Sequence, residues 1–162
     1  MSMILYLRRV EDVAALWEKA AEPEEFFEFL DSPESTGDLV DLDKGWQVIH
    51  FVLTGSWENK GPLAFLLHAG VPIGEDPGYG PVRLAAPAEV RSFRDAFATL
   101  NDAELRRRYE PAAMAAQNVY LADTLADEGE DGWAYVMQSI PALRKLLDRS
   151  VETGSAIAIW VM

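Results

Sequence analysis

The sequence contains no cysteine and only two histidines, His50 and His68. Without cysteine, disulfides and every metal site built on thiolates are excluded. The two histidines are far apart in the chain and no His-Glu-x-x-His pattern surrounds them, which makes them a weak basis for a zinc site. We therefore expect neither a metal nor a cofactor.

Basic residues are also scarce, with 14 Lys and Arg against 27 Asp and Glu and a formal net charge of −13. This balance argues against nucleic acid, whose phosphates must be neutralised by cations, and against anionic membrane surfaces. No apolar run approaches the roughly 20 residues that span a bilayer, and the apolar run 3–7 is too short for the core of a signal peptide. The sequence predicts a cytoplasmic protein whose partner is a protein or a small ligand. It does not predict the oligomeric state.

A chain of 162 residues with 49% hydrophobic residues is long enough for one domain, and we expect a single domain over 1–162. Short apolar runs predict strands at 3–7, 82–85 and 155–161, and helical spacing fills most of the remaining chain. The strands do not alternate with single helices. The pattern indicates an α+β fold, with a small sheet of about three strands (N-terminal, central and C-terminal) and several helices packed around a buried central helix.

That central helix is predicted over residues 41–55, where almost every side of the helix is apolar, as is typical of a buried one. Four residues share one face at spacing i, i+3, i+4 and i+7: Trp46, Ile49, His50 and Leu53. Asp41 or Asp43 can cap the first turn, and Gly55 can take the left-handed conformation that ends a helix. We expect the other elements to pack around this helix.

The segment 70–81 has four glycines and three prolines in twelve residues, which excludes a helix and a regular central strand. We expect a rigid loop beside the central helix, so that a cleft with inward-facing polar groups lies between them. The residues predicted to line this cleft come from both segments and from the strand that follows: Asp43, Trp46, His50, Glu75, Asp76, Tyr79 and Arg83.

Two functions fit this set. The leading hypothesis is a non-enzymatic binding domain, because the sequence contains no Walker-type loop, dinucleotide fingerprint or Gly-x-Ser-x-Gly elbow. The alternative is a small hydrolase-like or transferase-like enzyme in which His50 is a general base oriented by Asp43 or Glu75, and Arg83 holds an anionic group. In a purely structural interpretation, His50 is a core histidine bonded to a carbonyl or carboxylate, and Arg83 ties Glu75 or Asp76 to the fold.

Two further residues have a structural and a functional interpretation. Trp57 stands in the polar loop 55–61, where it either covers the core, which we favour, or is an exposed contact residue. His68 falls in the last turn of a short helix predicted over 62–68, where a cation suits the helix dipole.

The run DLDKGWQVIHFVLTG at 41–55, then Pro62-Leu63 and IGEDPGYGPVR at 73–83, resembles the YfbM-like family of small bacterial proteins of unknown function. The opening run 3–10 and the closing run 156–160 fit the same family, so the resemblance spans nearly the whole chain. It implies a single α+β domain and supplies no reaction, substrate or catalytic residues. One departure is Arg9, ahead of the first predicted helix, where a Ser or Thr cap is expected.

Overall fold

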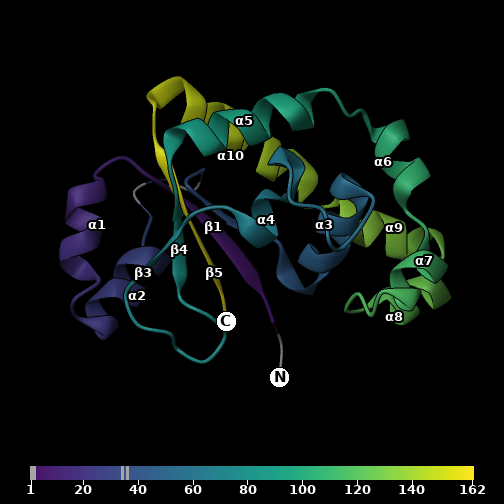
Figure 1. The fold of residues 1–162 in the computed structure, drawn as a ribbon, viewed down its shortest axis with the longest axis horizontal. Helices are drawn as coiled ribbons and strands as arrows, with labels where there is room; N and C mark the ends of the chain where they lie inside the picture. Colours follow the sequence, from purple (N-terminus) through teal and green to yellow (C-terminus); the bar gives the residue numbers. More distant parts are fainter. Residues whose placement is uncertain (1–2, 34, 36) are drawn as a thin grey trace.

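The fold, seen here in a computed structural model that describes residues 3–33, 35 and 37–162, is centred on a five-stranded antiparallel sheet (Figure 1). The strand order is β2-β1-β5-β4-β3. The strands are β1 (Leu5–Val10), β2 (Leu39–Asp41), β3 (Val71–Ile73), β4 (Val82–Ala85) and β5 (Ala156–Val161). The two central pairings place Leu7 opposite Ile159 and Arg83 opposite Ile159, so β5 is the middle strand.

The helices lie between and beyond these strands in the chain. They are α1 (Val13–Lys19), α2 (Pro23–Asp31), α3 (Trp46–Thr54), α4 (Phe65–His68), α5 (Pro87–Ala98), α6 (Asp102–Arg108), α7 (Pro111–Ala116), α8 (Ala122–Glu128), α9 (Glu130–Met137) and α10 (Ile140–Thr153). Short 3-10 turns, η1 (Asp43–Gly45) and η2 (Pro62–Ala64), lead directly into α3 and α4. Within the described residues, no helix has both the length and the apolar character needed to cross a membrane.

Helices cover both faces of the sheet, and the alternation along β5 shows how. Ile157 and Ile159 belong to the larger core, which β5 shares with α3, α5 and α10, whereas Ala158 and Trp160 belong to a smaller core with α1 and α2. Successive side chains of a strand point to opposite faces, so a strand covered on both sides is apolar throughout. This explains why the run at the end of the chain is continuously hydrophobic.

The predicted α+β class is confirmed, but the sheet has five strands, so the prediction of about three was too low. The missed strands, β2 and β3, are the two edges of the sheet and have three residues each. Pro72 lies within β3, which an edge strand tolerates because one side of it needs no ladder hydrogen bond. Strands this short carry too few alternating residues to give a clear pattern in the sequence.

The central helix is buried as predicted, but it is shorter and begins later. Residues 39–41 form β2, and α3 begins only at Trp46, with no side-chain cap at its first turn. Asp41 instead accepts a hydrogen bond from the backbone N–H of Asp43 at 2.6 Å, which stabilises the 3-10 turn. The predicted end is confirmed, because Gly55 follows α3 in the left-handed conformation with φ of 75°.

Arg9 lies within β1 and its guanidinium group is buried beside Asp38, with Nε 2.7 Å from Oδ1. The expectation of a helix cap at position 9 is therefore wrong, because the strand continues to Val10. The cap of α1 is Asp12, whose side chain accepts a hydrogen bond from the backbone N–H of Ala15 at 2.9 Å.

Candidate functional site

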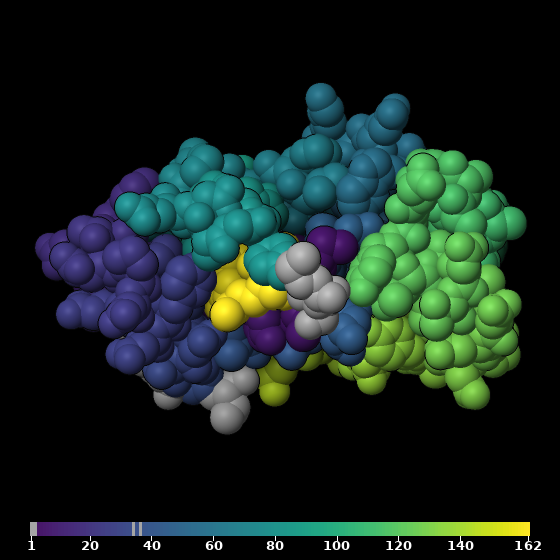
Figure 2. All heavy atoms as spheres, turned by 90° about the horizontal axis from the view of Figure 1, so that it is seen from below, coloured from purple at the N-terminus to yellow at the C-terminus, as the bar shows by residue number. Residues whose placement is uncertain are grey.

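The Gly/Pro-rich loop and α3 lie on opposite faces of the sheet. Gly74, where the loop begins, packs so closely on Phe26 of α2 that an added Cβ would lie 3.1 Å from the Phe26 ring. Glu75 and Asp76 line a small hollow against α2. Figure 2 shows the teal surface of this loop beside the purple and dark-blue surface of α1 and α2. The predicted cleft between α3 and the loop is not formed by the described residues.

His50 lies in the interior, where its side chain has no exposed surface. Its Nε2 is 3.2 Å from the carbonyl oxygen of Trp57, and the two rings meet edge to face at 5.3 Å. Burial lowers the pKa of His50 and outweighs the hydrogen bond to Trp57, which acts in the opposite direction; the nearby His68 lowers the pKa further. Trp57 therefore covers the core at this point, and His50 is a neutral core histidine that bonds a carbonyl.

The acids proposed to orient His50 are engaged elsewhere. Asp43 accepts a hydrogen bond from the hydroxyl of Tyr135 at 2.9 Å. Burial and this bond raise the pKa of Tyr135 to about 12. Glu75 is exposed on the other side of the sheet. Among the described residues no carboxylate bonds His50, so the geometry of a general base oriented by Asp43 or Glu75 is absent.

The remaining predicted residues serve the fold in separate places. Trp46 donates from its indole N–H to the carbonyl oxygen of Met3 at 3.1 Å. Asp76 closes its own loop by accepting from the backbone N–H groups of Gly78 at 2.7 Å and Gly80 at 2.9 Å. Tyr79 stays partly exposed, and it lines a shallow apolar hollow at the carboxyl end of β5.

Arg83 ties β4 to α4. Its guanidinium group donates to the carbonyl oxygens of Ala69 at 2.6 Å and Leu66 at 2.7 Å. Burial lowers the pKa of Arg83, and the nearby Glu89 carboxylate acts in the opposite direction. The prediction that Arg83 pairs with Glu75 or Asp76 is wrong, because Val82 and Leu84 face α1 and α2, so Arg83, which lies between them in the strand, faces the other side.

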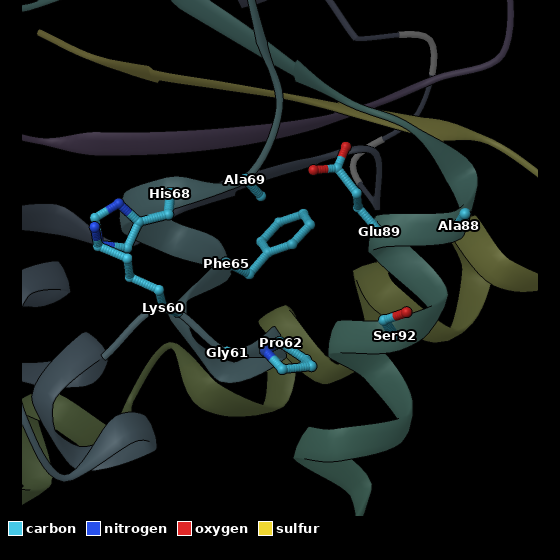
Figure 3. A pocket seen from close by; sticks show the side chains of 10 residues that line it. Lys60, Gly61, Pro62, Phe65, His68, Ala69, Ala88, Glu89 and Ser92 are labelled. Atoms are coloured by element: carbon cyan, nitrogen blue, oxygen red, sulfur yellow. The ribbon is translucent and has the colours of Figure 1, made fainter. Parts of the chain in front are cut away.

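A pocket of about 430 Å³ lies on this same side of the sheet, between the segment 60–69 and the first turns of α5 (Figure 3). The ring of Phe65 lies at its centre and is almost completely buried, with 3% of the residue exposed. His68 and Lys60 lie toward one end, and Glu89 and Ser92 project from α5 at the other. None of the residues predicted for the cleft lines this pocket.

The walls of the pocket are fixed by contacts beneath them. Phe65 stacks on Phe93 of α5, with ring centroids 4.6 Å apart and planes only 8° from parallel. The Glu89 carboxylate accepts from the backbone N–H of Gly70 at 3.1 Å and from that of Ala86 at 2.9 Å. The end of α4 and the start of α5 are therefore held together from both sides.

Three polar side chains at the pocket are left for contact with a ligand. Lys60, His68 and Ser92 are exposed, and within the described residues none of them makes a side-chain hydrogen bond or an ion pair. His68 does end α4, as the dipole argument predicts, and its ring lies 6.3 Å from that of His50. No sequence pattern indicates this group, because its members come from a loop and two separate helices.

No group of three or more His, Asp or Glu side chains in the described part of the chain is arranged to hold a metal ion. The lining of the pocket is apolar at its centre, and its hydrogen-bonding groups lie at its ends.

An antiparallel sheet with helices on both faces, and a pocket between the segment 60–69 and α5, defines a small α+β domain. The sequence matches the family model described as Domain of unknown function (DUF1877) over residues 1–160, so the chain belongs to this family. The crystal structure of a protein of unknown function, YfbM from Escherichia coli, matches the fold with a TM-score of 0.72. That match has 20% sequence identity and covers 99% of this chain and 100% of the other. No curated protein matches the sequence.

The predicted YfbM-like family is confirmed by these comparisons, and the fold agrees. They assign no reaction, ligand or partner, so function has to be argued from the pocket.

Proposed function

We propose that this protein is a binding domain whose ligand is a small organic molecule held between the segment 60–69 and α5. The observation that carries the proposal is the pocket of about 430 Å³ around Phe65. Its volume falls in the range of about 300 to 1,000 Å³ that is typical of small-molecule sites. An apolar centre with a few polar groups at the rim is the usual composition of such a site.

The proposal keeps the binding function expected from the sequence and moves it to a different place. The enzyme alternative is not carried forward, because it depended on an acid beside His50. The net charge of −13 supports the expectation that neither nucleic acid nor an anionic membrane is the partner. A cytoplasmic location in a bacterium stays a prediction.

The test is a titration of the ¹⁵N-labelled protein with benzamide, a neutral aromatic probe small enough for the pocket, followed by NMR. We expect the amide signals of residues 60–69 and 88–92 to shift together and to saturate. The variant Ala88→Trp places an indole at the exposed Ala88 wall of the pocket and should abolish these shifts.

The matched control is Ala98→Trp, which adds the same indole at an exposed position at the far end of the same helix. This variant should bind the probe as the unaltered protein does. The proposal fails if benzamide leaves these amides unmoved, or if Ala88→Trp binds it normally while circular dichroism shows the native fold.

A further inference from the structure

We propose that the ligand of this pocket carries an anionic group, such as a carboxylate, which binds at Lys60 and His68 while its apolar part lies against Pro62 and Ala88. The inference deepens the proposed function and rests on it. Three observations support it: the charges that line the pocket, the engagement of Glu89, and the arrangement along the pocket.

The first observation is the charge of the lining. Three of the side chains that line the pocket can carry charge, namely Lys60, His68 and Glu89, and two of these are cationic or can become so. In a chain with 27 acidic and 14 basic residues, such a balance is the reverse of the average surface. Lys60 and His68 form no ion pair with any carboxylate in the described part of the chain. Both side chains are thus available to a ligand.

The second observation is that the negative charge of Glu89 is already engaged. Both of its oxygens accept backbone N–H groups, from Gly70 and from Ala86, and Arg83 lies close enough to interact with it electrostatically. The carboxylate also stands in the first turn of α5, where the helix dipole favours negative charge. Because Glu89 occupies that position, a ligand anion is directed away from the helix end.

The third observation is the order of groups along the pocket. The close-up places Lys60 and His68 at one end, Phe65 in the middle, and Glu89 with Ser92 at the other end (Figure 3). A ligand with its anion at the first end lays its apolar part against the exposed Pro62 and Ala88 walls, and a second polar group reaches the Ser92 hydroxyl.

The experiment compares three aromatic probes of nearly equal shape and different charge, namely benzoate, benzamide and benzylamine, by NMR titration at low ionic strength. An ion pair at an exposed site strengthens binding modestly, so we expect benzoate to bind about two- to fivefold more tightly than benzamide. Benzylamine should bind more weakly than benzamide. Added salt should reduce the preference for benzoate and leave benzamide binding nearly unchanged.

The variants Lys60→Met and His68→Gln should remove the preference for benzoate while benzamide still binds. Lys145→Met, which removes the same charge from an exposed position of α10 that does not line the pocket, should leave the preference intact. If benzoate and benzamide bind the unaltered protein equally at these amides, the anion proposal is overturned and the proposed function stands. If neither probe reaches these amides, both are overturned.

Discussion

The Nε2 atom of His50 lies 3.2 Å from the carbonyl oxygen of Trp57, and this contact joins the middle of α3 to the loop that follows it. Nε2 donates, so the ring is held as the neutral tautomer with its proton on that atom. The Nδ1 atom is buried and has no hydrogen-bond partner among the described residues. A proton added there would place an uncompensated charge in the interior, and this has a measurable consequence.

We expect the stability of the protein to fall on mild acidification because of His50. Burial lowers the pKa of His50 below its ordinary value of about 6.5, so on acidification the unfolded chain binds a proton at a pH where folded His50 is still neutral. The stability that neutral, buried His50 contributes is fully present above about pH 6.5. It declines as the pH falls, by up to about 1.4 kcal/mol per pH unit, until His50 is protonated in the folded protein as well. Urea unfolding between pH 7.5 and 5.5 measures this decline in the free energy of unfolding.

The comparison that isolates this effect is His50→Gln, whose side-chain amide can still donate to the Trp57 carbonyl but does not titrate. The free energy of unfolding of this variant should decline less steeply over the same range. Parallel pH profiles for the two proteins would contradict the assignment of the slope to His50.

A second prediction concerns the buried pair of Arg9 and Asp38, which are 6% and 3% exposed. Burial alone would raise the pKa of Asp38, but the hydrogen bond from Arg9, with help from Arg149, holds it below its usual value. Asp38→Asn removes the buried one of the two carboxylates that pair with Arg9, so we expect a loss of about 3 kcal/mol in the free energy of unfolding at pH 7.

Glu11→Gln is the matched control, since Glu11 also bonds the Arg9 guanidinium, at 2.5 Å, but is well exposed. Its loss should stay under about 1 kcal/mol in the same denaturation experiment. Equal losses for the two variants would show that burial of the pair is not what stabilises this corner of the fold.

The elements that the sequence predicted well are those whose burial is uniform along the element. The end of the chain reads as a strand because β5 is covered on both faces, and α3 reads as a buried helix because residues 48–53 are buried on every side. The strand 82–85 was predicted with its observed bounds. For β5 and α3, local composition is enough, because the surroundings are apolar on every side.

The candidate site could not be predicted in this way. Periodicity shows which side chains of an element are buried, but it does not show on which face of the sheet a loop lies. The loop 74–81 lies against α2, where Gly74 packs on Phe26, and this contact between distant segments does not show in the local sequence pattern. Likewise, Lys60, His68 and Glu89 have nothing in common in the sequence, and only the packing of α4 against α5 brings them to one pocket.

A third prediction tests the close approach of Gly70 to β4. Gly70 has φ of 89°, and an added Cβ would lie 2.8 Å from the carbonyl carbon of Leu84, which is backbone and cannot turn aside. Gly70→Ala should therefore combine the cost of a left-handed alanine, about 1 kcal/mol, with a steric cost of about 1–3 kcal/mol. Thermal and urea unfolding measure the sum.

Gly78→Ala separates the two costs. Gly78 also has a positive φ, of 115°, but nothing lies within 4 Å of an added Cβ. This variant should lose only about 1 kcal/mol, and the difference between the variants reports the contact with β4. Losses of the same size would mean that the backbone near Leu84 moves away without cost.

The last prediction concerns Arg83, because its two hydrogen bonds hold the segment that forms one wall of the pocket. Arg83→Met leaves the carbonyl oxygens of Leu66 and Ala69 without this donor. A hydrogen bond that involves a charged group contributes about 1.5–3 kcal/mol to stability. We expect a loss of about 2 kcal/mol in the free energy of unfolding, together with weaker binding of benzamide, since Ala69 lines the pocket.

Arg83→Lys should have a stability between those of Arg83→Met and the unaltered protein, because an ammonium group lacks the planar fork that reaches both carbonyls. Arg91→Met, which removes an exposed arginine of α5, should change neither property. Native stability and native probe binding in Arg83→Met would show that α4 is held by its apolar contacts alone.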